Sequence, residues 1–235
     1  MKKYELTNEK KTLLDGTVLH RIRALRDIPR FGVKAGELGG FVEGEINLLQ
    51  DGDAWVFCNA NVYENACVYG DAKVSGDAWV YGDAKVSGDA KACGNAKVYG
   101  NSLVCDDAMV YDDARVYDNA KVRGYAKVYD NAKVRGYAKV CGYAKVYGDA
   151  EVCSDAKVCD TADYITFKNS WSSGRWFTYT RSNKMWRVGC FHGTGEELVK
   201  KAYADSELSG RCYEAIVRAV ETIEAAKAEA KGEAK

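Results

Sequence analysis

The sequence of 235 residues predicts a mainly β protein: a parallel β-helix of about six triangular coils, with an N-terminal cap and a small C-terminal α+β module. The main observation is a period of six. From Val56 to Val158 a valine recurs at every sixth position, and an alanine follows four positions later, with Ala92 and Ser102 as the only exceptions. The second observation is that aromatic residues replace this repeat soon after residue 162.

The period of six excludes an α-helix for this segment. Because an α-helix turns about 100° per residue, six residues turn about 600° and successive valines would face different directions. The eighteen hexads are instead expected to form short strands, with Gly-Asp or Gly-Asn pairs at the corners between them. Three strands close one triangular coil of eighteen residues, and the coils stack at roughly 4.8 Å in a solenoid.

The pattern aliphatic-x-Gly-Asp/Asn-small-x resembles the hexapeptide repeat of left-handed parallel β-helix proteins. That superfamily contains acyltransferases, γ-class carbonic anhydrases and non-catalytic scaffolds, and the resemblance implies the left-handed sense of the coil. Residues 19–27, 35–43 and 52–56 are also similar to the opening of bacterial and phage proteins that carry only an acetyltransferase label. The resemblance is specific for the fold and says little about activity.

Three segments are predicted. Residues 1–49 form a cap, because the end of a solenoid exposes unpaired backbone and apolar interior. Residues 50–163 form the β-helix, although residues 42–46 resemble a degenerate hexad, which places the start of the coil near residue 40. Residues 164–235 form the α+β module.

The module is expected to contain strands at 164–168, 175–180 and 184–191. Thr194 and Glu197 have the spacing of a capping box, which predicts a helix to about residue 203. A second helix is expected from about residue 206, continued by the Ala/Lys/Glu-rich tail. Its apolar stripe consists of Tyr213, Ile216, Val217, Val220 and Ile223.

Charge and composition narrow the function classes. The chain has 34 basic and 34 acidic residues, so no overall field draws it to nucleic acid or to a membrane surface. No apolar run of about eighteen residues and no signal-peptide pattern are found, so a soluble cytoplasmic protein is expected.

The nine cysteines are scattered through the repeat, and reduced thiols are expected. Cys105, Cys141 and Cys159 fall on one outward column, but no histidine lies between His20 and His192. A zinc site usually needs four nitrogen or sulfur ligands, so no metal site is predicted. The three histidine ligands that the resemblance would require for carbonic anhydrase chemistry are also missing.

One outward column is aromatic, and it consists of Tyr63, Tyr81, Tyr99 and Tyr117. Stacked rings on parallel strands stabilise the sheet by about 0.2–1 kcal/mol per pair. Tyrosine is also enriched in interfaces, which makes these residues candidates for the interface of a homo-oligomer, and the resemblance favours a homotrimer. Tyrosine and lysine columns are compatible with nucleic acid, but the neutral charge balance makes it an unexpected partner.

Acyl transfer with acyl-CoA is the enzymatic alternative, because in the resembling family a histidine on a loop between coils deprotonates the acceptor. A general base needs a pKa near neutrality, which leaves His20 and His192 as candidates. The eighteen hexads run without an insertion, so no catalytic loop projects from them. His192 precedes Gly193-Thr194-Gly195 at a helix start, where backbone N–H groups can receive an anion.

The module offers a set of candidate ligand-binding residues: Arg175, Tyr179, Arg181, Trp186, Arg187 and His192. Arginine planes and aromatic faces suit nucleotides or phosphates, although the rings can equally form the core of a small module. The sequence therefore predicts a non-catalytic β-helical scaffold that binds or sequesters a host protein or a nucleotide-like ligand. No catalytic residue and no cofactor are required, and a CoA-dependent acyltransferase is the alternative.

Overall fold

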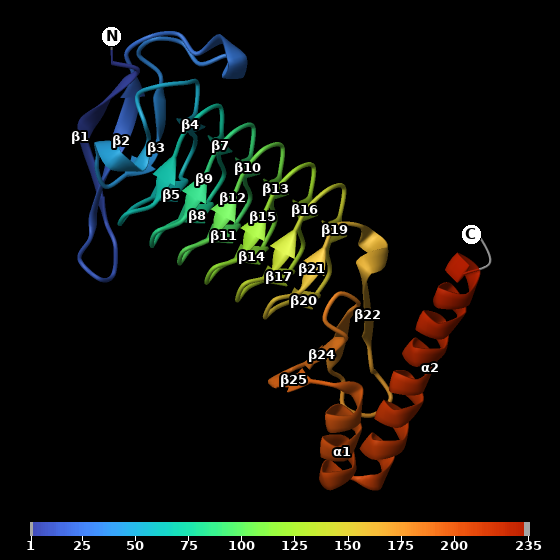
Figure 1. The fold of residues 1–235 in the computed structure, drawn as a ribbon. Coiled ribbons are helices and arrows are strands. Elements are labelled where there is room, and N and C mark those ends of the chain that lie inside the picture. The colour runs from blue at the N-terminus through green and yellow to red at the C-terminus, as the bar shows by residue number, and fades with distance from the viewer. Residues whose placement is uncertain (1, 233–235) are drawn as a thin grey trace. The chain divides into compact units, whose positions relative to one another are not determined.

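The computed structural model describes residues 2–232, with side chains to residue 230, so Met1 and residues 233–235 of the predicted tail lie outside the described residues. The chain consists of two compact units, Met1–Asp163 and Tyr164–Lys235. The first is a parallel β-helix with antiparallel strands at its start, and the second is a four-stranded sheet with two helices (Figure 1). The predicted mainly β fold with an α+β module is confirmed.

Each of the eighteen hexads contributes one two-residue strand, and strands three apart pair in parallel. The strands are β4 (Trp55–Val56), β5 (Asn61–Val62), β6 (Cys67–Val68), β7 (Lys73–Val74), β8 (Trp79–Val80), β9 (Lys85–Val86), β10 (Lys91–Ala92), β11 (Lys97–Val98), β12 (Leu103–Val104), β13 (Met109–Val110), β14 (Arg115–Val116), β15 (Lys121–Val122), β16 (Lys127–Val128), β17 (Lys133–Val134), β18 (Lys139–Val140), β19 (Lys145–Val146), β20 (Glu151–Val152) and β21 (Lys157–Val158).

The interior consists of the valine and alanine columns, which are fully buried from Val56 to Val158 apart from Ser102, itself buried. Apart from Ala92, which lies between Val74 and Val110, each residue of the valine column lies opposite a valine eighteen residues away, as Val62 does with Val80. Side chains of one size thus stack in register along each face. This regular packing explains why the β-branched residue and the small residue keep their places in every hexad.

The coil begins earlier than the regular hexads. Strand β3 (Leu38–Val42) pairs in parallel with β5, and Leu48 forms a parallel bridge to Val68. The β-helix therefore has about seven turns rather than the predicted six. The additional turn does not follow the six-residue period, because the 3-10 helix η2 (Glu45–Asn47) interrupts the repeat. The side chain of Asn47 in η2 donates hydrogen bonds to the backbone carbonyls of Glu64 and Ala66 on the next coil.

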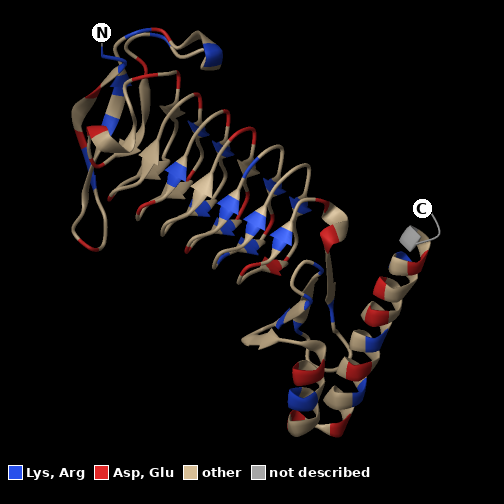
Figure 2. Ribbon diagram, in the orientation of Figure 1, with Lys and Arg blue, Asp and Glu red and all other residues tan. Residues whose placement is uncertain are grey.

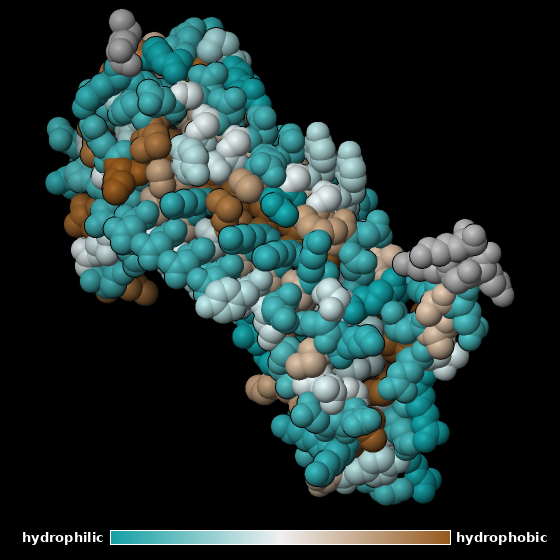
Figure 3. Space-filling view, in the orientation of Figure 1, coloured by the Kyte–Doolittle hydropathy of each residue, from teal (hydrophilic) through white to brown (hydrophobic). Residues whose placement is uncertain are grey.

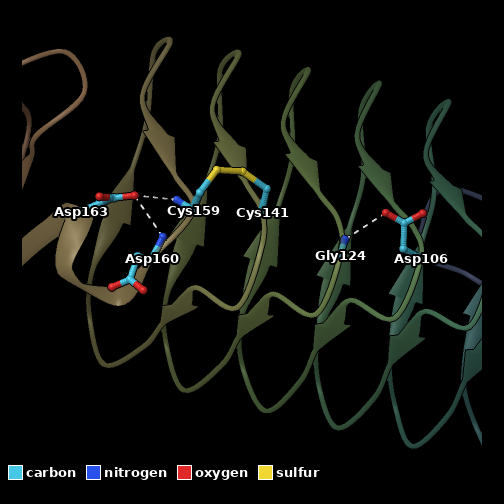
Figure 4. The surroundings of a disulfide bond; sticks show 6 residues. All are labelled: Asp106, Gly124, Cys141, Cys159, Asp160 and Asp163. Carbon is cyan, nitrogen blue, oxygen red and sulfur yellow. Dashed lines mark hydrogen bonds between the residues drawn. A yellow bond between two sulfur atoms is a disulfide. The ribbon is translucent and has the colours of Figure 1, made fainter.

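The corners need a left-handed backbone. Glycines such as Gly88 occupy this conformation at no steric cost, whereas Asp106 adopts it with φ 61°. The Asp106 carboxylate accepts a hydrogen bond from the backbone N–H of Gly124, one coil further on, at 3.0 Å (Figure 4). Asp118 and Asp130 make the same bond to Gly136 and Gly148. An acidic corner residue therefore satisfies a backbone donor of the next coil.

The N-terminal segment extends one face of the β-helix. Strands β1 (Tyr4–Thr12) and β2 (Val18–Ala24) pair antiparallel, and β2 pairs antiparallel with β3, so the three strands continue the sheet that contains β5 and β8. The loop between β2 and β3 contains the 3-10 helix η1 (Pro29–Phe31). Much of the hydrophobic surface in Figure 3 lies over this N-terminal part, whereas the surface over the coils is largely hydrophilic.

The last coil is closed by a disulfide and a carboxylate. Cys141 and Cys159, on neighbouring coils, form a disulfide with a Cα–Cα distance of 4.4 Å (Figure 4). The carboxylate of Asp163, in the 3-10 helix η3 (Thr161–Asp163), accepts hydrogen bonds from the backbone N–H groups of Cys159 and Asp160. The expectation of nine reduced thiols is wrong for this pair, because parallel pairing brings the two side chains together. The other seven cysteines are outside disulfides.

The C-terminal unit has the antiparallel sheet β22 (Tyr164–Lys168), β23 (Trp176–Thr180), β24 (Met185–Val188) and β25 (Phe191–Gly193), followed by helices α1 (Gly195–Asp205) and α2 (Glu207–Gly232). The predicted capping box is confirmed, since Thr194 and Glu197 each accept from the other's backbone N–H. The strand predicted at 184–191 is wrong, because a turn at Gly189, with φ 55°, divides it into β24 and β25.

Both helices pack on one core. Phe177, Trp186, Leu198, Tyr213 and Val217 are its central members. Tyr213, Val217 and Val220 of the predicted stripe are buried, whereas Ile223 is exposed. Within residues 2–232, no helix has both the length and the apolar character needed to cross a membrane.

Candidate functional site

The C-terminal unit has a groove of about 280 Å³, which we call the C-terminal groove. It lies between the β24–β25 turn and helices α1 and α2. Its lining residues are Arg175, Val188, Gly189, Cys190, Phe191, Leu198, Lys201, Ala202, Asp205 and Tyr213. The volume is at the lower end of the range of about 300–1,000 Å³ that is typical for small-ligand pockets.

The rim of the C-terminal groove is shaped by the β24–β25 turn. The guanidinium of Arg187 donates hydrogen bonds to the carbonyls of Cys190 and Phe191, at 3.2 and 3.4 Å, and so holds the turn. The stem of Arg175 packs beside Gly189, since its Cδ would lie 3.5 Å, an ordinary van der Waals distance, from a Cβ at this position. Arg175 and Phe191 therefore border the same opening.

The C-terminal groove combines an apolar floor with two cations, Arg175 and Lys201, and one carboxylate, Asp205. Leu198, Ala202 and Tyr213 are buried and form the floor. Arg175 is exposed, and the Lys201 ammonium lies 5.9 Å from the centroid of the Phe191 ring. Among the described residues neither cation forms an ion pair. The groove can therefore take a ligand that combines a negative charge with an apolar or aromatic part.

A second groove, of about 290 Å³, lies on another part of the same unit. Its lining residues are Tyr179, Lys184, Trp186, Gly195, Val220, Glu221 and Glu224. Burial, together with the nearby carboxylate of Glu224, raises the pKa of Tyr179. Arg181 donates to that same carboxylate at 2.7 Å. Two carboxylates line this groove and the adjacent arginine is already paired, so it is a poor site for an anion.

The six predicted ligand-binding residues do not form one site. Arg175 borders the C-terminal groove, whereas Tyr179 and Trp186 line the second groove and belong to the core, with ring centroids 5.1 Å apart. Arg187 lies opposite His192 in the register of β24 and β25, and its side chain stabilises the turn between them. These residues lie apart because successive side chains of a strand point to opposite faces of the sheet. The sequence did not show where the turn falls, so it did not show which side chains share a face.

Sequence reasoning missed Lys201 and Phe191. A signal for Lys201 was present: Leu198 and Ala202 are four apart and form the buried face of α1, and Lys201 is next to that face. Phe191 was expected within a continuous strand, and its place beside the groove depends on the turn at Gly189.

The β-helix has a groove of about 430 Å³ beneath the loop that contains η1. Its lining residues are Arg30, Phe31, Asp71, Lys73, Asp89, Lys91, Asp107 and Met109. Arg30 forms ion pairs with Asp71, at 3.4 Å, and with Asp89 on the next coil, while the ring of Phe31 packs edge-on against Phe57. These contacts attach the loop to the coils, so much of the charge in this groove is already paired.

The predicted tyrosine column is a continuous stack. The ring centroids of Tyr81, Tyr99 and Tyr117 are 4.9 Å apart, and the rings are nearly parallel. Tyr63, at the start of the column, is buried against Leu19 and Phe41 of the same chain. Burial raises the pKa of all four phenols. Tyr81, Tyr99 and Tyr117 are half-buried, which leaves these three for contact with a partner.

The two histidines lie in different units. His20 is in β2, where its Nδ1 lies 3.2 Å from the carbonyl oxygen of Thr7. His192 is in β25, opposite Arg187. Neither lines any of the grooves described above. In the described part of the chain, no group of three or more histidine, cysteine, aspartate or glutamate side chains has the arrangement of a metal site.

Comparison with known proteins adds no assignment. No protein-family model matches this chain, and no curated protein is significantly similar to it. The parallel β-helix with an α+β unit defines an architecture that hosts many functions, so the function is argued from the geometry of the grooves and surfaces.

Proposed function

We propose that the protein is a non-catalytic binding scaffold whose C-terminal groove takes up an anionic, nucleotide-like molecule. The observation that carries this proposal is the pair of cations, Arg175 and Lys201, which border an apolar floor and have no ion-pair partner among the described residues. Phe191 adds an aromatic ring next to Lys201. A phosphate between the cations and a base against the apolar surface satisfy both parts of the groove.

The scaffold part of the proposal rests on the β-helix. Its regular interior gives a rigid support, and the half-buried column Tyr81, Tyr99 and Tyr117 is the surface on which we propose that copies of the chain associate, with a trimer preferred. The resemblance to phage proteins suggests a molecule of the host as the sequestered ligand. We propose a cytoplasmic location: the seven cysteines outside disulfides support it, and the Cys141–Cys159 disulfide would have to withstand the reducing environment there.

The acyltransferase alternative has less support from the geometry. His20 and His192 lie in different units, and neither lines the grooves described above. A general base has to reach the proton that it removes, at about 2.6–3.2 Å. Detectable acyl-CoA turnover that is lost in His20→Ala or His192→Ala would favour this alternative over sequestration.

The proposal is tested by calorimetric titration of the full chain with a panel of nucleoside mono- and diphosphates. Lys201→Glu and Arg175→Glu are each expected to weaken binding about tenfold or more, because each reverses one of the two charges. Lys200→Glu is the matched control: it has the same charge and lies on the same helix, but it does not line the groove. Its effect is expected to stay below about twofold.

Native mass spectrometry of the protein released from cell extract complements the titration, since it reports bound small molecules and the number of subunits together. Failure of every nucleotide in the panel, or an equal loss of affinity in Lys200→Glu and Lys201→Glu, would contradict the assignment of the groove.

A further inference from the structure

The β-helix separates its charges along its length, which the neutral balance of the whole chain hides. Residues 50–114 contain eleven acidic and four basic side chains, whereas residues 115–157 contain five acidic and nine basic ones. Between residues 121 and 147 there are seven basic residues and one acidic residue, Asp130. Figure 2 shows the lysine and arginine residues mainly along the strands and the acidic residues mainly at the turns. A local field exists where the overall charge predicts none.

One corner column changes its chemistry where the charge changes. In the early coils it consists of Asp71, Asp89 and Asp107, which we call the Asp corner. In the next two coils the same column consists of Tyr125 and Tyr143, which we call the Tyr corner. The two tyrosine rings stack with centroids 5.0 Å apart at an angle of 5°, and the residues are 52% and 73% exposed.

Cations line both sides of the Tyr corner. Lys121 lies opposite Lys139 on one side, and Lys127 lies opposite Lys145 on the other. Arg123, two residues before Tyr125, adds a fifth charge. Like charges that face each other on neighbouring strands are destabilising. None of these five forms an ion pair with a residue of the described chain, and the Asp130 carboxylate accepts from Gly148. A bound anion would relieve this repulsion.

We infer that the Tyr corner is a binding surface for single-stranded nucleic acid. The lysines on both sides supply contacts to successive phosphates, and the exposed rings supply faces on which unpaired bases stack. The column continues from Tyr143 to Thr161, so the position after Tyr143 in this column holds no aromatic ring. A base can stack there as the next ring of the column.

Two other partners fit less well. The bases of a duplex are already stacked on each other and do not offer their faces to the rings. A second copy of this chain would have to bring acidic residues, but in the Asp corner Arg30 already forms ion pairs with Asp71 and Asp89 of its own chain. The inference concerns the first unit alone and does not rest on the C-terminal groove.

The test is fluorescence anisotropy of a labelled oligothymidine with the full chain at about 50 mM salt, repeated at higher salt. The double variant Lys121→Glu/Lys139→Glu is expected to bind about tenfold more weakly or worse, with a smaller dependence on salt. Tyr143→Ser is expected to lose about fivefold or more in affinity while the salt dependence stays unchanged. All three residues are exposed, so thermal melts should match those of the parent protein.

Lys91→Glu is the matched control, because Lys91 occupies the same place in its hexad as Lys127 but lies beside the Asp corner. Its effect is expected to be below about twofold. Absence of binding at low salt, or an equal loss in Lys91→Glu, overturns the inference. A dimer would also overturn it. If sedimentation shows a salt-sensitive dimer that is lost in the double variant but is not dissociated by the oligonucleotide, a second copy of the chain occupies the Tyr corner. Arg175→Glu separates the two proposals, because it should leave oligonucleotide binding unchanged.

Discussion

The early and the late coils of the β-helix have the same interior and opposite surfaces. Val80 and Val134 are both fully buried and stack on identical neighbours. Outside, the same corner column presents Asp89 in one region and Tyr143 in the other. Two residues of every hexad, at the valine and alanine positions, thus fill the interior, and the outward positions are free to vary. Places where an outward column changes its chemistry are therefore where binding surfaces should be sought.

The two ends of the β-helix also differ. At the start, β1 and β2 extend one sheet with antiparallel strands, and Lys3 is fully buried there. At the finish, the disulfide Cys141–Cys159 and the carboxylate of Asp163 close the last coil. Each coil contacts only its neighbours, so perturbations should act locally.

The largest effect is expected from a charge placed in the shared interior. Val80→Asp in the early coils and Val134→Asp in the late coils should each cost about 4 kcal/mol or more, because a buried carboxylate has no partner there. Urea unfolding followed by circular dichroism measures this. Lys133→Gln, at the neighbouring outward position, should change stability by less than about 0.5 kcal/mol. A mild effect of either valine variant would contradict the common interior.

Loss of the disulfide should affect the late coils of the β-helix and leave the early coils unchanged. It closes a segment with a sequence separation of 18 residues, for which a loop-entropy model gives roughly 3 kcal/mol. Cys141→Ser is expected to lower the protection of amides in the last coil, while the coils around Val80 keep theirs. Hydrogen exchange with mass spectrometry measures both regions in one experiment, and Cys67→Ser, at a cysteine outside the disulfide, is the control. Uniform loss of protection would show that the coils unfold as one unit.

Lys3 should give the early end a distinctive pH dependence. Burial, with the nearby Arg26, lowers the pKa of Lys3 to about 8 in the folded chain, and its ammonium has no hydrogen-bond partner among the described groups. Between about pH 8 and 10.5 the unfolded chain binds more protons, so stability attributable to this group rises with pH. Lys3→Met should stabilise the protein by roughly 2 kcal/mol at pH 7 and by less at pH 10.

Chemical denaturation at the two pH values measures this difference, with Lys2→Met as the control because Lys2 is exposed. The prediction fails if Lys3→Met gives the same stabilisation at both pH values, since packing alone would then account for it.

The smallest change in stability is expected from substitutions at a corner that has an aspartate where other corners have a glycine. Asp106→Ala loses the hydrogen bond to Gly124 and keeps an unfavourable left-handed backbone, which should cost about 1–2 kcal/mol. Asp106→Gly loses the same bond but relieves the backbone, so its stability should stay within about 0.5 kcal/mol of the parent protein. Thermal melts of the two variants measure the difference. Equal destabilisation would mean that the backbone conformation contributes little.

The sequence predicted the β-helix well because its signal repeats in every coil: each of the eighteen hexads is a strand at the predicted position. It also placed the start of the coil near residue 40, where β3 lies, but it counted one coil too few, because Leu48 pairs with Val68 without the period. It missed the disulfide, whose formation depends on how neighbouring side chains meet. In the second unit the turn at Gly189 determines which side chains reach the C-terminal groove. Such a turn involves one glycine, and a single residue gives no periodic signal.

The eighteen-residue register also makes the molecule adjustable in length. Deleting one whole coil from the middle removes a strand from each of the three faces, and every column then meets its own continuation. The shortened protein should keep both ends and lose roughly 4.8 Å of height. Removing a single hexad instead joins unlike faces and rotates one end by a third of a turn against the other. Paired deletions of this kind would turn the β-helix into a molecular ruler whose spacing and orientation can be set separately.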